Sequence, residues 1–314
     1  ILEESRRNET ERAKGDGERM KIRQIVGMAA AAVGLVFVGS INMYMQQSVR
    51  AAMEDSAPDG EETDGYEDDG YYYDEDYEIT FPEEDFIQRI DVQGEISRSA
   101  SYDFYYGDYG YYDHQWTLEL IDELMENEYN KGILLYIDSP GGAIYESDEL
   151  YLKLMRYREK TGRPVRAYLA SEACSGGYYV AMAADHLTAN RNGLVGSIGV
   201  IVTVEDYSEM LKDMGISEIN FVSGENKTMS YGSEALTEEQ TAIYQAMVDE
   251  SYEQFVDIVA EGRGMTEERV KELADGRFYT AKQALENGLV DEIAVYEDME
   301  EAYLDEVGVT LLNE

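Results

Sequence analysis

The sequence predicts an α/β fold whose strands pair largely in parallel. The run at 133–137 is continuously apolar, as in a buried parallel strand, and 165–170 is a second strand candidate. A glycine-rich turn follows each of them, at 139–142 and at 175–177. Open α/β sheets place their ligands at the carboxyl ends of their strands, so the two turns are the first candidates for a functional site.

Strand and helix candidates alternate along the chain. We expect strands at 86–92, 133–137, 165–170, 186–189, 198–204 and 219–222. Helices are expected around 118–125, 144–160 and 207–214, with a short one beginning at Ser175. After Thr237 the chain is predicted to be mainly helical, because Thr237 and Gln240 have the spacing of a capping box at the start of a long helix.

The chain is strongly acidic. Its 314 residues include 25 Lys and Arg against 67 Asp and Glu, a formal net charge of −42, and 44% of the residues are hydrophobic. The hydrophobic content is sufficient for a sizeable core in one large or two modest domains. A polyanion repels nucleic acid phosphates and anionic lipid head groups, so we expect no nucleic acid partner.

Residues 24–45 are predicted to be a transmembrane anchor. No charge interrupts the stretch from Ile25 to Ile41. Seven basic residues precede it within 1–23, whereas only Arg50 lies close behind it. Positive residues stay in the cytoplasm, so we expect a single-pass protein of the cell membrane with a cytoplasmic N-terminal segment and an extracytoplasmic remainder. A buried core helix or a cleaved signal peptide fits the flanking sequence less well.

Residues 46–84 are predicted to form a disordered acidic linker rich in Tyr and Gly. Its segment 54–78 contains thirteen Asp or Glu and no Lys or Arg, and it shows no apolar period. The folded domain is expected to span 85–296, with a Tyr-rich loop insertion at 101–113. Residues 297–314 are expected to form a C-terminal helical extension.

Ser175 is the candidate nucleophile. It would lie where a short helix begins after a strand, and the N–H groups and dipole of a helix N-terminus favour negative charge. Acyl transfer also needs a base and hydrogen-bond donors for the oxyanion, and Gly141 and Gly142 of the neighbouring turn can supply backbone N–H groups. The alternative is that Ser175 is only the N-cap of the helix, a common role for serine.

The base is harder to identify from local sequence. His186 lies on an apolar strand and is better interpreted as a core histidine, and Cys174 as a small buried hydrophobic residue. Lys227 lies in a loop of small residues; a lysine can be a base if burial lowers its pKa from about 10.4 towards neutral, but loop lysines are mostly exposed. The one cysteine and two histidines lack metal-ligand spacing, so we expect no metal site.

Several ordered strings between 85 and 293 resemble the signal peptide peptidase A family of the Clp protease/crotonase superfamily. They are DSPGGAIYES at 138–147, SGGYY at 175–179, GSIGV at 196–200, SGENK at 223–227 and GRFYT at 276–280, followed by Ala284 and GLVDE at 288–292. The resemblance implies a spiral of ββα units and a serine peptidase without metal or nucleotide cofactor. The nucleophile of the family falls on Ser175 and its catalytic lysine on Lys227.

The same resemblance implies further roles. Gly142 matches the oxyanion donor of the family, with Gly141 beside it and Gly176 after the nucleophile, and Ser197 would orient the lysine. Asp138 departs from the pattern, because Asn is expected there, and it adds a negative charge near the oxyanion turn.

The function implied is a serine endopeptidase that hydrolyses apolar membrane-derived peptides such as residual signal peptides. Members assemble into homo-oligomeric rings or domes, and in short members the serine and lysine of one site can come from neighbouring subunits.

Two other functions stay open. A crotonase-like acyl-CoA enzyme would need a basic CoA-binding surface, which the acidic chain disfavours. A catalytically inactive membrane-anchored scaffold would not need both Ser175 and Lys227.

Overall fold

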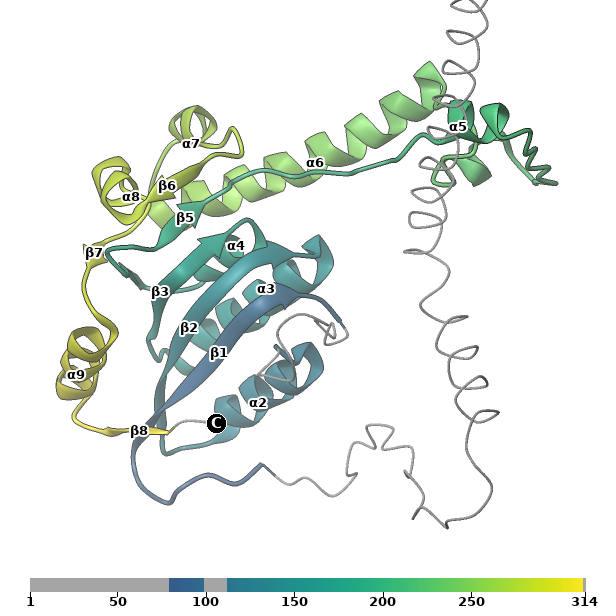
Figure 1. Ribbon diagram of the computed structural model, residues 1–314. Coiled ribbons are helices and arrows are strands. Elements are labelled where there is room, and N and C mark those ends of the chain that lie inside the picture. Colours follow the sequence, from purple (N-terminus) through teal and green to yellow (C-terminus); the bar gives the residue numbers. More distant parts are fainter. Residues whose placement is uncertain (1–78, 99–111, 313–314) are drawn as a thin grey trace, which may run out of the picture. The chain divides into compact units, whose positions relative to one another are not determined.

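The computed structural model describes residues 79–98 and 112–312 (Figure 1). The strands among them are β1 (Phe86–Ile96), β2 (Asn130–Gly142), β3 (Val165–Cys174), β4 (His186–Ala189), β5 (Leu194–Gly196), β6 (Phe278–Thr280), β7 (Glu292–Ile293) and β8 (Thr310–Leu312). The helices are α2 (His114–Glu126), α3 (Ile144–Thr161), α4 (Gly176–Ala181), α5 (Ser208–Asp213), the 3₁₀ turn η1 (Glu225–Thr228), α6 (Glu238–Arg263), α7 (Glu267–Leu273), α8 (Ala281–Asn287) and α9 (Tyr296–Val307).

The described strands form one sheet in the order β6-β5-β3-β2-β1-β8, with β4 and β7 attached beside β3. Every pair is parallel except β5 with β6. Helices separate the central strands along the chain, as parallel connections require. The α/β class with largely parallel pairing is confirmed.

The two faces of the sheet carry different side chains, because successive residues of a strand point to opposite sides. On β2, Ile133, Leu135 and Ile137 belong to the main hydrophobic core, together with buried residues of α2, α3 and α4. Leu134 belongs to a second cluster, in which it packs with residues of α9 such as Met299. The sheet is therefore covered on both faces, by α2 to α4 on one and by α9 over part of the other.

The C-terminal segment contributes to this sheet. After α9 the chain forms β8, which pairs in parallel with β1 from Phe86 opposite Thr310 to Gln88 opposite Leu312. Within α9, Tyr303 is fully buried, and its hydroxyl donates to the carbonyl of Pro164 at 3.1 Å. Residues 297–312 thus extend the sheet edge and cover its second face.

The capping box predicted at Thr237 is confirmed. The Gln240 N–H donates to Thr237 Oγ1 and the Thr237 N–H donates to Gln240 Oε1, both at 3.1 Å. These bonds satisfy two donors that the first turn of α6 would otherwise leave unpaired.

The strands expected at 198–204 and 219–222 are wrong. Both segments lie outside the sheet and expose apolar side chains, with Ile201 83% and Phe221 97% exposed. A strand needs a partner for its N–H and C=O groups, but β3 and β6 occupy the two edges of β5. The chain after β5 instead runs out beside α6 and carries α5 away from the sheet (Figure 1).

The predicted N-terminal segment, anchor, most of the linker and most of the Tyr-rich insertion fall within 1–78 and 99–111, outside the described residues. Within 79–98 and 112–312, no helix combines the length and the apolar character needed to cross a bilayer.

We predict that Met299→Ala lowers the free energy of unfolding by about 2–5 kcal/mol, because it removes a buried side chain that joins α9 to the sheet. Glu301→Ala on the same helix is the matched control, since Glu301 is exposed, and it should change stability by less than about 0.5 kcal/mol. Urea unfolding followed by circular dichroism measures both. Equal effects would show that α9 does not depend on this contact.

Candidate active site

Ser175 lies between β3 and α4 in a strained backbone conformation. Its φ is +50° and its ψ is −121°, a region that non-glycine residues rarely adopt. Its N–H donates to the Gly196 carbonyl at 2.8 Å, and its carbonyl accepts the Tyr179 N–H at 2.9 Å. Ser175 occupies the N-cap position, but its side chain makes no capping hydrogen bond. Strain of this kind, about 1–3 kcal/mol per residue, persists where the surroundings enforce it and gathers at functional sites.

The glycine turn at the end of β2 is packed directly against Ser175. A Cβ on Gly141, whose φ is +105°, would lie 2.7 Å from the Ser175 Cβ and 2.6 Å from the Gly176 nitrogen. A Cβ on Gly176 would lie 2.3 Å from Ser147 Oγ and 3.2 Å from the Gly142 nitrogen. Only glycine fits at Gly141, and a side chain at Gly176 would displace the Ser147 hydroxyl; the small size of both residues brings the peptide groups of the two turns together.

Two N–H groups of these turns are the best candidates for oxyanion donors. The Gly141 N–H donates to Ser139 Oγ at 3.1 Å, and that buried hydroxyl donates in turn to the Gly94 carbonyl at 2.6 Å. The Gly141 donor is therefore engaged within the turn. Gly142 and Gly176 are left as the candidates: Gly176 directly follows Ser175, and the Gly142 nitrogen would lie 3.2 Å from a Cβ on Gly176.

Ser197 is joined to Ser175 through the peptide group between Gly196 and Ser197. It follows Gly196, whose carbonyl accepts the Ser175 N–H, and its own N–H donates to the Arg277 carbonyl at 2.9 Å. Its φ is +49°, so Ser175 and Ser197 are the two non-glycine residues with positive φ in the described chain. Two of the residues singled out from sequence thus occupy strained positions next to each other.

A small cavity of about 70 Å³ opens beside Ser175. Its walls are mostly apolar and come from four parts of the chain: the end of β2 and start of α3, α4, the segment after Ser197, and α6. The lining includes Gly142, Ile144, Ser147, Gly176, Tyr179, Gly199, Val200, Ile201, Ser251 and Phe255. Its size and walls suit a small apolar side chain next to the candidate nucleophile.

A polar network holds three helices around this cavity. The Tyr179 hydroxyl on α4 donates to Asp148 on α3 at 2.6 Å, and Gln254 Nε2 on α6 donates to the Tyr179 oxygen at 2.7 Å. Burial raises the pKa of Tyr179, and the Asp148 carboxylate raises it further. The phenol therefore stays protonated and keeps its donor to Asp148.

Lys227 lies apart from these residues. It is exposed in η1, where its N–H donates to the Gly224 carbonyl at 3.1 Å, and it is not among the residues that line the cavity. The segment between α5 and α6 lies near the N-terminal end of α6, away from the sheet (Figure 1). Within one copy of the described chain, Ser175, Ser197 and the three glycines come together, and Lys227 does not join them.

The other two candidates from the sequence have different surroundings. Cys174 is 1% exposed and its thiol donates to the Leu194 carbonyl at 3.6 Å, as expected of a small buried residue. Burial raises the pKa of this thiol to about 12, which disfavours the thiolate that a nucleophile needs. The expectation of a core histidine at His186 is wrong: it is partly exposed and lies 3.4 Å from the Glu292 carboxylate.

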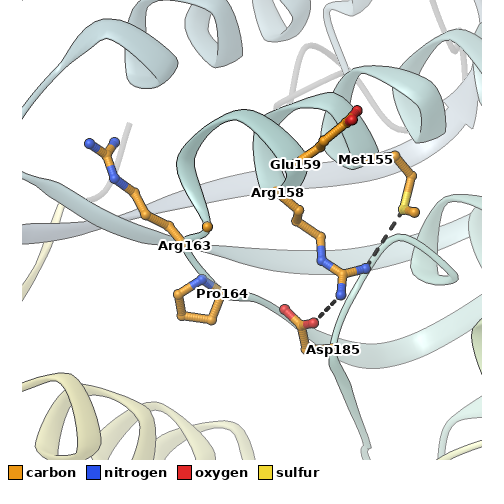
Figure 2. A pocket seen from close by; sticks show the side chains of 7 residues that line it. Met155, Arg158, Glu159, Arg163, Pro164 and Asp185 are labelled. Atoms are coloured by element: carbon orange, nitrogen blue, oxygen red, sulfur yellow. Dashed lines mark hydrogen bonds and ion pairs between the residues drawn. The ribbon is translucent and has the colours of Figure 1, made fainter.

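A larger pocket of about 490 Å³ lies at the other end of α3, and Figure 2 shows the side chains that line it. The Arg158 guanidinium is paired with Asp185 and also donates to the Ala183 carbonyl at 3.0 Å. The Arg163 guanidinium points away from that pair (Figure 2) and donates to the Leu124 carbonyl at 2.9 Å. Both guanidinium groups are engaged in contacts within the fold, so the pocket is a poor anion site.

No cluster of metal-ligating side chains exists within 79–98 and 112–312.

Comparison with known proteins identifies the family. Residues 157–310 match the model described as Peptidase family S49. The chain is 42% identical over 213 residues to "Putative protease slr0021" of Synechocystis sp.. The aligned region covers 68% of this chain and 71% of that protein. It is 40% identical over 187 residues to "Putative signal peptide peptidase SppA" of Enterococcus faecium, covering 60% of this chain and 54% of that protein.

A third relative is "Protease 4" of Haemophilus influenzae, 31% identical over 168 residues, which cover 54% of this chain and 27% of that protein. An α/β sheet with a strained serine at a glycine-lined strand end is an arrangement that an acyl-transfer site can use. The chain belongs to peptidase family S49, the signal peptide peptidase A family. It spans about half the length of the Enterococcus relative.

We predict that Gly141→Ala destabilises the protein more than Gly162→Ala does. Both positions have positive φ, which disfavours alanine by about 1–2 kcal/mol, but nothing lies within 4 Å of a Cβ on Gly162. The contacts at Gly141 should add about 1–3 kcal/mol of overpacking. Urea unfolding gives both values, and equal losses would mean that the turn does not press on Ser175.

We predict that Cys174 resists alkylation in the native protein. Its burial and raised pKa, about 12, leave little thiolate at pH 8. Mass spectrometry after iodoacetamide treatment should find the thiol unmodified until urea is added. Rapid labelling of the folded chain would return Cys174 to the list of candidate nucleophiles.

Proposed function

We propose that this chain is a serine endopeptidase in which Ser175 is the nucleophile and Lys227 the general base. The observation that carries the proposal is the Ser175 backbone, held at positive φ against a glycine turn with its hydroxyl free of any capping role. Membership of a peptidase family supports the same chemistry.

The reaction would proceed through an acyl-enzyme. The neutral Lys227 amine takes the proton of Ser175 Oγ while that oxygen attacks the peptide carbonyl carbon, and the N–H groups of Gly142 and Gly176 donate to the oxyanion. The protonated amine then gives its proton to the leaving nitrogen. Water attacks the acyl-enzyme while Lys227 accepts its proton, and the protonated amine then gives a proton to Ser175 Oγ as the acyl C–O bond breaks, which restores the neutral amine and the free serine.

The base would be supplied by a neighbouring copy in a homo-oligomeric ring. Lys227 is exposed on a segment whose apolar side chains are exposed as well: Ile201, Met214, Ile216, Ile219, Phe221, Val222 and Tyr231. Large exposed apolar surfaces mark interaction sites, and a closed ring of identical copies covers such a surface in every subunit. Burial of the amine in that contact favours its neutral form, and Ser197 of the site that it enters would orient it.

The substrates would be extended apolar peptides such as residual signal peptides. The small apolar cavity beside Ser175 and the name of the Enterococcus relative support this class. The finer features from the sequence complete the proposal: a Clp protease/crotonase-type spiral of ββα units, an anchor at 24–45, and a domain on the extracytoplasmic side of the cell membrane. The mostly parallel sheet supports the spiral.

A fluorogenic apolar peptide and the full chain in detergent test the dyad. Ser175→Ala and Lys227→Ala should each reduce turnover by about a thousandfold or more, because each removes one half of the proton transfer. Lys212→Ala is the matched control: Lys212 is also exposed on the segment between β5 and α6, and its loss should leave turnover unchanged.

Mixing the two inactive variants tests where the base comes from. If subunits exchange, an equal mixture should recover about a quarter of wild-type turnover, since one contact in four joins an intact serine to an intact lysine. No recovery after verified subunit exchange would contradict a base from the neighbour. Turnover that survives in both single variants would contradict the dyad itself.

A further inference from the structure

A second pocket of about 490 Å³ lies on the α9 face of the sheet, away from the main core. Three tyrosines from three elements line it: Tyr136 on β2, Tyr168 on β3 and Tyr296 on α9. Their ring centroids are 5.2–5.8 Å apart, with Tyr296 edge-on to the other two. We call this site the tyrosine pocket.

One cation of the chain already contacts these rings. The Arg89 guanidinium carbon lies 4.4 Å from the Tyr136 centroid and 5.1 Å from the Tyr296 centroid, within the range of a cation–π interaction. Arg89 is neutralised by Asp91 through contacts of 2.6 and 3.1 Å. Two of the three rings thus already take part in a cation–π contact, and Asp91 offsets the charge of Arg89.

The surroundings of the pocket are acidic. Asp138 and Glu297 line it, and Glu172 lies next to it, with its N–H donating to Asp138 Oδ1 at 3.1 Å. None of the three carboxylates forms a salt bridge among the described residues. Burial raises the pKa of Glu172, and the charge of Asp138 raises it further. Arg191 lies in sequence between the lining residues Asn190 and Asn192, but its side chain is exposed and does not line the pocket.

We propose that the tyrosine pocket binds the cationic end of a lysine or arginine side chain of a peptide. Aromatic faces and unpaired carboxylates together favour a positive group over a neutral or an anionic one. An apolar ligand would leave Asp138 and Glu297 without a cationic partner, and a phosphate or carboxylate would meet their repulsion.

The tyrosine pocket and the candidate active site share the same two strands. Asp138 precedes Gly141 by three residues on β2, and Ser171 of the pocket lies on β3, four residues before Ser175. A basic side chain held in the pocket would therefore dock its peptide at the strand ends that carry Ser175. Binding does not depend on the proposed peptidase activity, so the test uses the full chain with Ser175→Ala, which cannot turn over the probe by that route.

The probes are three pentapeptides, blocked at both ends, with alanine flanks and lysine, arginine or norleucine at the centre. Norleucine has nearly the shape of lysine without its charge. Isothermal titration calorimetry should show saturable binding of the lysine and arginine probes, at least about tenfold tighter than the norleucine probe. Binding should weaken as salt rises.

Variants on α9 locate the binding. Tyr296→Leu should weaken the lysine probe by about three- to tenfold, whereas Tyr296→Phe, which keeps the ring, should stay within about twofold. Glu297→Gln should weaken it about threefold, and Glu301→Gln, the same charge change outside the pocket, should not.

Equal affinity for lysine and norleucine, absence of saturable binding, or equal effects of Glu297→Gln and Glu301→Gln would each overturn the proposal. Circular dichroism melting verifies that each variant is folded. If Tyr296→Leu does not fold, the two glutamate variants decide the outcome without it.

Discussion

The contact between two glycine turns at the ends of β2 and β3 is the constraint on which the candidate site depends. Parallel pairing continues to the last residues of β2, where Gly142 lies opposite Ile96, so the turn cannot move away from the sheet. A Cβ on Gly141 would stand 2.7 Å from the Ser175 Cβ. This close approach holds the serine at positive φ, and the same packing aligns the nitrogens of Gly142 and Gly176 beside it. The strain at Ser175 and the placement of the two candidate oxyanion donors thus have one structural cause.

β2 serves three purposes because its side chains alternate. Leu135 and Ile137 point into the main core and stabilise the sheet, while Tyr136 and Asp138 point to the α9 face and line the tyrosine pocket. The strand then ends in the glycine turn. Asp138, where the family pattern has Asn, accepts the Glu172 N–H across to β3. Asp138 lines the tyrosine pocket and directly precedes the turn, so its charge lies close to the pocket and to the strand ends.

Local patterns predicted the elements that local chemistry decides. The apolar run at 133–137, the helix at 144–160 and the Thr237 capping box depend on neighbours in sequence, and all three are present. The strands at 198–204 and 219–222 failed because apolar composition does not tell whether a sheet edge is free. The tyrosine pocket depends on the register between β2 and β3 and on where α9 docks, so its residues, up to 161 positions apart, could not be grouped from sequence.

The candidate site residues also differ in whether their roles depend on neighbours in sequence or on distant contacts. Ser175 and the glycines were found because their turns follow strands directly, but Ser139, which engages the Gly141 N–H, gave no local indication of that role. Lys227 was found by resemblance alone, and its exposed position in one chain explains why local sequence could not identify it. An amine in water is charged and a poor base; it becomes useful only where a contact excludes water. Under the proposed function, a lone subunit would therefore hold a prepared nucleophile without its base, and assembly would switch the peptidase on by covering the apolar segment and the lysine in one step.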